Sequence, residues 1–152
     1  MTDIHSKAVR SKNMAAIKGR NTRPEMLVRR ALHTAGFRYR LHVANLPGKP
    51  DLLFPKYKAV IFVQGCFWHQ HQCAMFHWPK TRTEWWKQKI SSNRAHDEAV
   101  QDKLRELGWR VLLVWECALK GKTKVPLPQL TDEIAHWLRD GSSFAELPEV
   151  VE

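Results

Sequence analysis

Apolar residues along the chain alternate between helical and strand spacing. Thr22 followed three residues later by Glu25 is a capping box, and the predicted helix extends to Gly36. Over residues 37–43, apolar side chains alternate with arginine and histidine, which predicts a strand with one core face and one basic face. Further buried strands are predicted from continuous apolar runs at 52–54, 59–63 and 109–115.

Two more helices complete the pattern. A second capping box, Thr81 with Glu84, predicts the start of the longest helix, which runs to Leu107. A shorter helix is predicted over 131–138, and residues 141–152 are expected to form a loose tail. The order of one helix, three strands, a long helix, a strand and a last helix predicts an α/β sandwich around a small mixed sheet.

Length and composition favour a single domain over residues 1–152. The chain is 43% hydrophobic, which is enough for one core and too little for two ordinary domains at this length. No stretch reaches the roughly 18 apolar residues of a membrane span, and the polar first residues do not resemble a signal peptide. We therefore expect a cytoplasmic protein without a membrane partner.

Positive charge is concentrated at the amino-terminal end. Residues 1–49 hold eleven Lys and Arg against two acidic residues, a local charge of +9, whereas the remainder holds fourteen against thirteen. Such a field displaces counterions from a phosphate backbone, so nucleic acid is the expected partner. Residues 1–20, polar and basic, are expected to be a DNA-contacting arm or short helix. The alternative is a merely soluble, basic surface.

Three cysteines and two histidines have the spacing of metal ligands. Cys66 and Cys73 enclose His69 and His71, and Cys117 follows a predicted strand. A set of three cysteines and one histidine would fill all four positions of a structural zinc site, although spacing alone does not choose between the histidines. Free cysteine also packs as a small hydrophobe, so three unrelated buried thiols are the alternative.

Carboxylates elsewhere are candidates for catalysis. Asp51 begins a predicted strand and could hold Mg²⁺ with coordination positions left for phosphate and water, or it could simply form a Pro-Asp turn. On the long helix, Asn93 and Asp97 share a stripe with apolar residues that turns toward the interior. Asp97 could orient His69 for proton transfer, or it could belong to a solvated i, i+4 pair.

Several segments together resemble the very-short-patch mismatch repair endonucleases. They are the run Cys66-Phe67-Trp68-His69-Gln70-His71-Gln72-Cys73, with 10–14, 47–51, 108–111 and 115–117. The resemblance spans residues 5 to 140. It implies an α/β fold with three layers, restriction-endonuclease-like, with a central mixed β-sheet flanked by helices and a structural zinc loop. It also implies a bacterial, monomeric enzyme that nicks DNA 5′ of the thymine in T:G mismatches formed when 5-methylcytosine deaminates.

The resemblance implies roles for individual residues. Cys66, His71, Cys73 and Cys117 would bind structural Zn²⁺, which leaves His69 for catalysis. Asp51 and the backbone carbonyl of Val63 would hold Mg²⁺, and His69, supported by Asp97, would activate or orient the attacking water. Glu25 is similar to a further acidic residue that lines this centre.

DNA contacts are implied in the same way. Phe67, Trp68 and Trp86 resemble aromatic residues that wedge into the base stack at the mismatch, with Met14 entering from the other groove. Insertion costs a few kcal/mol of unstacking per step and costs less at a mispaired step, so the wedge itself favours mismatches. Lys89 and Asn93, one and two turns past Trp86, are expected to read base edges.

One residue departs from the family pattern. Relatives often carry threonine and histidine where this chain has Val63 and Gln64, and glutamine does not accept a proton as histidine does. We expect either weaker activity or an orienting role at Gln64. Two rival functions stay open: a restriction-type endonuclease on matched DNA, and a non-catalytic zinc-containing DNA binder. A nucleobase deaminase is excluded because no Pro-Cys-x-x-Cys follows His96-Asp97-Glu98.

Overall fold

The computed structural model describes residues 21–69, 71, 73 and 76–149. One five-stranded sheet organises this part of the chain, in the order β1-β2-β3-β4-β5. The first three strands pair antiparallel and the last three pair parallel, so the sheet is mixed, as predicted. The strands are β1 (Arg40–Leu41), β2 (Leu52–Phe54), β3 (Ala59–Gln64), β4 (Arg110–Trp115) and β5 (Phe144–Leu147).

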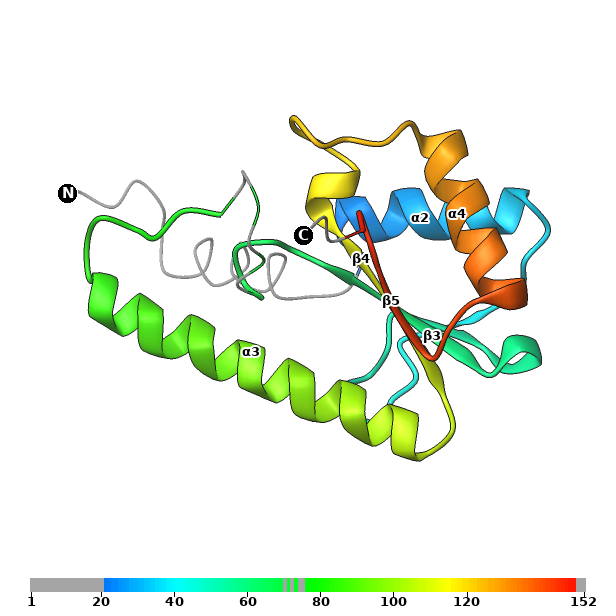
Figure 1. Cartoon of the computed structure of the whole chain (residues 1–152), viewed down its shortest axis with the longest axis horizontal. Coiled ribbons are helices and arrows are strands. Elements are labelled where there is room, and N and C mark those ends of the chain that lie inside the picture. The colour runs from blue at the N-terminus through cyan, green and yellow to red at the C-terminus, as the bar shows by residue number, and fades with distance from the viewer. Residues whose placement is uncertain (1–20, 70, 72, 74–75, 150–152) are drawn as a thin grey trace, which may run out of the picture.

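Helices cover both faces of the sheet, giving the three layers that were predicted (Figure 1). On one face α2 (Arg23–Thr34) and α4 (Leu127–Asp140) enclose a core that includes Leu32, Ile61 and Ile134. On the other face α3 (Thr83–Glu106) contributes Leu104 to a second core. The two cores separate because successive strand residues point to opposite faces. No helix in the described part of the chain is long and apolar enough to span a membrane.

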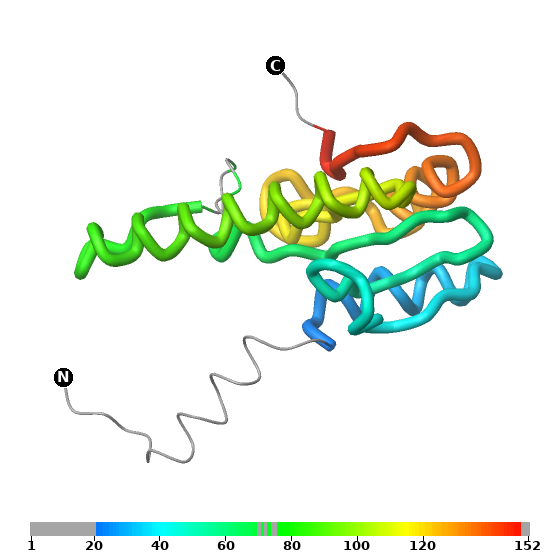
Figure 2. The backbone as a smooth tube through the Cα atoms, turned by 90° about the horizontal axis from the view of Figure 1, so that it is seen from below, coloured from blue at the N-terminus to red at the C-terminus, as the bar shows by residue number. Residues whose placement is uncertain are grey.

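Helix α3 reaches well beyond the sheet. Its first turns project past the strands, in both views (Figures 1 and 2). Of its 24 residues, Ile90 and Leu104 are buried. The end of the helix that carries Trp86 is therefore held out beside the loop that follows β3.

The strand expected at 37–43 is much shorter than predicted. Only Arg40 and Leu41 pair with β2, and Leu41, which was expected to face the core, is 41% exposed. The backbone of His42 adopts the left-handed region with φ of 47°, which breaks the two-residue period directly after Leu41. Phe37, by contrast, is buried in the core as predicted.

The capping box predicted from Thr81 and Glu84 does not form. Helix α3 begins at Thr83 after Arg82, whose φ of 53° is left-handed, and no side chain caps it. The capping box predicted at the start of α2, from Thr22 and Glu25, forms in part. Thr22 accepts the Glu25 N–H at 3.4 Å, while the Glu25 carboxylate accepts from Asn21 instead of Thr22.

The carboxyl-terminal region is more ordered than expected. Helix α4 begins at Leu127, four residues before the predicted start, and residues 144–147 of the expected loose tail form β5. Strand β5 pairs in parallel with β4, where Leu147 opposite Val114 enters the core. Four residues with a single buried leucine show little periodicity, so the pairing partner, rather than the local pattern, forms this strand.

A glycine fixes the loop that leads to Asp51. Gly48 has φ of 72°, and a Cβ there would lie 2.4 Å from Val100 on α3. Any side chain would therefore push the loop off the helix. This close approach places the start of β2, with Asp51, next to the face of α3 that carries Asp97.

Candidate active site and metal centre

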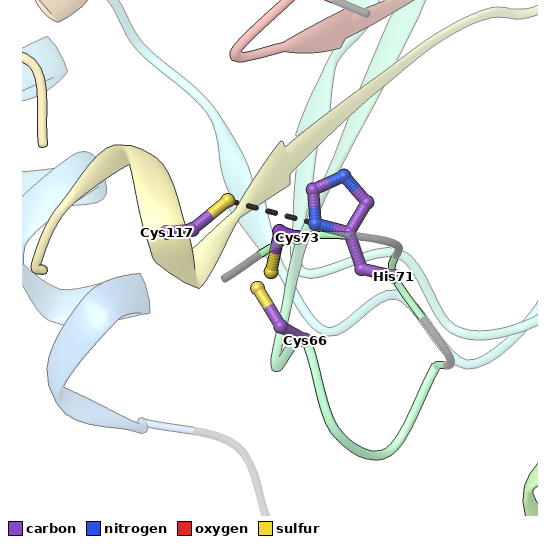
Figure 3. Close-up of side chains that lie close together, drawn as sticks. All are labelled: Cys66, His71, Cys73 and Cys117. Atoms are coloured by element: carbon purple, nitrogen blue, oxygen red, sulfur yellow. Dashed lines mark hydrogen bonds between the residues drawn. The ribbon is translucent and has the colours of Figure 1, made fainter. Parts of the chain in front are cut away.

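Three cysteines and one histidine converge at one edge of the sheet (Figure 3). Because β3 and β4 are parallel with Gln64 opposite Trp115, their carboxyl ends meet there, and Cys66 and Cys117 each follow two residues later. The ligand atoms of Cys66, His71, Cys73 and Cys117 all lie within 4.8 Å of one another. Of the two histidines that spacing left open, the structure brings His71 into this group.

The chemistry of this group fits a metal ion. Tetrahedral zinc with sulfur and nitrogen ligands has ligand atoms roughly 3.5 to 4 Å apart. Burial raises the pKa of both the Cys66 and Cys117 thiols, because neighbouring thiolates cannot be buried together without a cation. Burial lowers the pKa of His71, and the positive charge of Arg94 adds to this effect. The His71 ring stacks on Trp115, with 4.0 Å between the ring centroids. The group could therefore hold a metal ion.

Asp51 lies at a second polar centre on the same edge. Its Oδ2 accepts the backbone N–H of Val63 at 2.8 Å, which joins the start of β2 to the end of β3. Burial raises the pKa of Asp51 to about 7, and the neighbouring Glu25 carboxylate adds to this effect, whereas the Val63 hydrogen bond opposes it. A buried carboxyl with this environment takes up a cation readily when its proton leaves.

Glu25 is held by a network that includes a residue missed from the sequence. Its buried carboxylate accepts from the Asn21 N–H at 3.2 Å and from Arg29 at 2.9 Å, and it lies 3.0 and 3.1 Å from Nε2 of His42. The ligand atoms of Glu25, His42 and Asp51 lie within 4.8 Å of one another. His42 was assigned to the basic face of a strand, and only its left-handed backbone turns it inward.

His69 is paired with Asp97. The Nδ1 atom of His69 contacts Oδ2 of Asp97 on α3, so the turn after β3 is fastened to the helix. The hydrogen-bonded tautomer carries its proton on Nδ1, which leaves Nε2 as a free acceptor. Both side chains are only partly exposed, at 28% and 19%. The structure thus brings together the pair that the helical stripe suggested.

A cavity of about 270 Å³ joins these groups. It is lined by Asp51, Val63, Gln64, His69 and Asp97, among others. A wider hollow of about 680 Å³ shares Val63, Gln64, His69 and Asp97 with it and continues to Phe67, Trp68, Lys89 and Asn93. Gln64 is 7% exposed, and its Oε1 has no hydrogen-bond partner in the described residues. Asp51, His69 and Asp97 therefore meet at one opening, whereas the buried Glu25 lines neither cavity.

Aromatic side chains form a cluster beside this opening. Phe67 contacts Trp68 at 5.2 Å, and both contact Trp86 at 5.4 and 5.8 Å between ring centroids. Asn93 donates from Nδ2 to the backbone oxygen of Trp68 at 3.2 Å, which leaves its second N–H and its Oδ1 for a base edge. Lys89 is exposed on the rim. Met14 lies outside the described residues.

A family model and a similar protein both point to the same family. A model of the family described as DNA mismatch endonuclease Vsr matches residues 2–75. DNA mismatch endonuclease Vsr of Escherichia coli (strain K12) is 45% identical over 147 residues, which covers 97% of this chain and 94% of the relative. Type II nicking enzyme V.XorIIP of Xanthomonas oryzae is 47% identical over 119 residues, covering 78% and 88%. Type II nicking enzyme V.NmeAIP of Neisseria meningitidis is 44% identical over 122 residues, covering 80% and 87%.

The similarity extends over the segments that build the site. The relative from Escherichia coli aligns with nearly the whole chain, so the sheet edge, the Cys/His group and the opening between β3 and α3 all fall within the alignment. The other two relatives are both named as nicking enzymes. This chain belongs to the Vsr family of DNA mismatch endonucleases.

Proposed function

We propose that the protein nicks one DNA strand 5′ of the thymine in T:G mismatches that arise when 5-methylcytosine deaminates. The observation that carries the proposal is the His69–Asp97 pair, which opens into the same cavity as Asp51 and Val63, with aromatic rings beside it. A base, a cation-binding carboxylate and a stacking surface are what phosphodiester cleavage at a distorted base pair requires. The names of its relatives support the same class of reaction.

Two metal ions are part of the proposal. Cys66, His71, Cys73 and Cys117 would hold Zn²⁺, which has no open position and is structural. Asp51 and the carbonyl of Val63 would hold Mg²⁺, whose preferred ligands are oxygens. When bound there, Mg²⁺ would neutralise negative charge that develops on the phosphate.

His69 is proposed as the proton acceptor. With Nδ1 held by Asp97, its Nε2 would take a proton from a water molecule as the water oxygen attacks phosphorus. The bond from phosphorus to the leaving sugar oxygen then breaks, and that oxygen receives a proton from solvent. Asp97 would keep the correct tautomer and stabilise the imidazolium as it forms.

Glu25 is proposed to set the environment of Asp51. Its carboxylate is held by donors from Asn21, Arg29 and His42, so it is fixed in place. A fixed negative charge next to Asp51 would increase the attraction of this centre for a cation. Gln64, at the same opening, would orient water or substrate without exchanging a proton.

The aromatic cluster is proposed to read the mismatch. Phe67, Trp68 and Trp86 would enter the base stack, where a mispaired step separates at lower cost than a paired step. Lys89 and the free Oδ1 of Asn93 would contact base edges or backbone nearby. Met14, on the basic arm, would approach from the opposite groove. We further propose a monomer that works in the bacterial cytoplasm, ahead of downstream repair proteins.

The direct test compares two end-labelled duplexes, one matched and one with a single T:G mismatch, each with Mg²⁺ and with EDTA. The proposal predicts a single-strand nick 5′ of the mismatched thymine, with Mg²⁺ only. Equal cleavage of both duplexes would instead support a restriction-type endonuclease. Binding without cleavage under either condition would support a DNA-binding protein without catalysis.

A further inference from the structure

A second hollow lies on another part of the molecule, between α4 and the edge strand β5. Its volume is about 740 Å³, and it shares no lining residue with the two cavities of the candidate active site. Leu112, Trp137, Phe144 and Leu147 form its apolar part. Nothing in the proposed nicking reaction uses this groove.

The groove is acidic in a strongly basic protein. Three exposed carboxylates line it, from Asp132, Glu133 and Glu149, and no lysine or arginine does. Within the described part of the chain none of the three forms an ion pair. Glu146 also lines the groove, but its carboxylate accepts the indole N–H of Trp115 at 3.2 Å on the opposite face of the sheet. A phosphate backbone would be repelled here, whereas a cationic ligand would be attracted.

Strand β5 presents an open backbone edge to the groove. It is the last strand of the sheet and pairs only with β4 among the described strands. The N–H of Val111 donates to the oxygen of Ser143 at 2.9 Å, so odd-numbered residues of this segment turn toward β4. By alternation, the backbone groups of Phe144 and Glu146 turn outward, where a further strand could pair with them.

An unsatisfied donor points to a ligand in the same place. Trp137 is 6% exposed, and its indole N–H has no acceptor in the described residues. Leaving such a donor unpaired in a folded protein costs about 1 to 3 kcal/mol. The indole ring packs directly against Gly141, another lining residue, where a Cβ would lie 2.2 Å from it. A carbonyl oxygen of a bound chain would satisfy this donor.

We propose that this groove binds an extended, lysine- or arginine-bearing segment of a partner protein, which adds to the sheet as a strand beside β5. Its main chain would pair with Phe144 and Glu146, and a carbonyl would accept from Trp137. Its basic side chains would meet the carboxylates of Asp132, Glu133 and Glu149. Added strands gain affinity from main-chain hydrogen bonds and specificity from side chains, and here the specificity is for positive charge. The groove is separate from the nicking site, so this proposal stands or falls independently of the proposed function.

The test uses the full-length protein labelled with ¹⁵N and two capped ten-residue peptides. One peptide alternates lysine with valine, and the other alternates glutamate with valine. The lysine peptide should shift amide signals within residues 129–149 and slow hydrogen exchange of the Glu146 amide, while the glutamate peptide should do neither. Equal binding of both peptides, or shifts confined to other surfaces, would overturn the proposal.

Two variants make the test specific to the groove. Glu133→Gln with Glu149→Gln changes two exposed carboxylates and should raise the Kd of the lysine peptide at least tenfold without altering nicking. Trp137→Phe removes the indole donor and keeps an aromatic ring, and it should weaken binding as well, with folding checked by thermal unfolding. Unchanged Kd in the double variant would contradict the proposal. So would displacement of the lysine peptide by a peptide of residues 1–20, because the chain's own arm would then be the occupant.

Discussion

At the scale of single residues, the fold strongly changes the charge state of Asp51. Its pKa rises from 3.8 to about 7, so the folded protein holds a proton that the unfolded chain releases. The resulting stability is fully present below about pH 4 and is lost as the pH rises through about 7. In the absence of a divalent cation, the ionised carboxylate lies buried beside Glu25 with only the Val63 N–H as a strong partner.

This leads to a prediction about pH and metal. Above pH 7, Asp51→Asn should stabilise the metal-free protein by on the order of 2 to 4 kcal/mol, because it removes the buried charge. Mg²⁺ should stabilise the wild type at pH 8 and have little effect at pH 5.5, where the proton competes with it. Thermal unfolding with and without Mg²⁺ at both pH values measures this. Equal stabilisation of wild type and Asp51→Asn by Mg²⁺ would contradict the assignment.

Gln64 lowers the stability of the fold, because its buried Oε1 has no hydrogen-bond partner among the described groups. Gln64→Met keeps the length of the side chain and removes the polar atoms, so it should raise the free energy of unfolding by about 1 kcal/mol. Urea unfolding measures the change, and Gln101→Met, on the rim of the same cavity, is the matched control. A destabilised Gln64→Met protein would show that the amide has a partner that we have missed.

At the scale of elements, the parallel pair β3 and β4 builds the metal group, because their carboxyl ends deliver Cys66 and Cys117 to the same edge. The loop that follows β3 and carries Cys66, His71 and Cys73 is then held from two sides. His69 is fixed from the opposite side by Asp97 of α3, and Trp68 is fixed by Asn93. The loop therefore depends on the metal group on one side and on the helix on the other.

Removing one metal ligand should weaken this arrangement. Cys117→Ser should lower the bound zinc from one ion per chain to much less than one, and it should destabilise the protein by more than about 2 kcal/mol. Metal analysis of the purified protein and thermal unfolding measure the two effects. Adding zinc, but not magnesium, to chelator-treated wild type should restore its melting temperature. A Cys117→Ser protein with full zinc content would contradict the proposed ligand set.

The sequence predicted those elements whose formation depends on local patterns. The buried strands β3 and β4 and the helix α3 were predicted closely, and the pairing of His69 with Asp97 was one of the two alternatives that the helical stripe left open. Strand β5 and the inward turn of His42 were missed. The first depends on pairing with β4, and the second on a left-handed backbone angle, and neither is encoded by the apolar period.

At the scale of the whole molecule, a basic protein carries an acidic groove. The net charge is +10, yet the groove along β5 is lined by the exposed carboxylates of Asp132, Glu133 and Glu149 and by no lysine or arginine. The basic residues of the amino-terminal segment belong, in our proposal, to the DNA-binding side. DNA and a cationic partner could then be bound at the same time, because each is attracted to a different face.

This division predicts the salt dependence of DNA binding. Replacing Lys7, Arg10 and Lys12 together by glutamine should reduce the slope of log K against log salt by up to about 3. Lys56 lies in the turn after β2, at the end of the sheet opposite the candidate site, and Lys56→Gln should change the slope by much less. Fluorescence anisotropy with a T:G duplex at several salt concentrations measures both. An unchanged slope in the triple variant would show that these three residues of the arm do not contact DNA.

The central claim is that His69, oriented by Asp97, performs the proton transfer at the opening that contains Asp51. Single-turnover nicking of a T:G duplex, with binding affinity measured in parallel, tests it most directly for His69→Ala and the neighbouring Gln64→Ala. We predict that His69→Ala lowers the nicking rate about 10² to 10⁴-fold with little change in Kd, while Gln64→Ala retains activity. A His69→Ala enzyme that nicks at the wild-type rate would contradict the account.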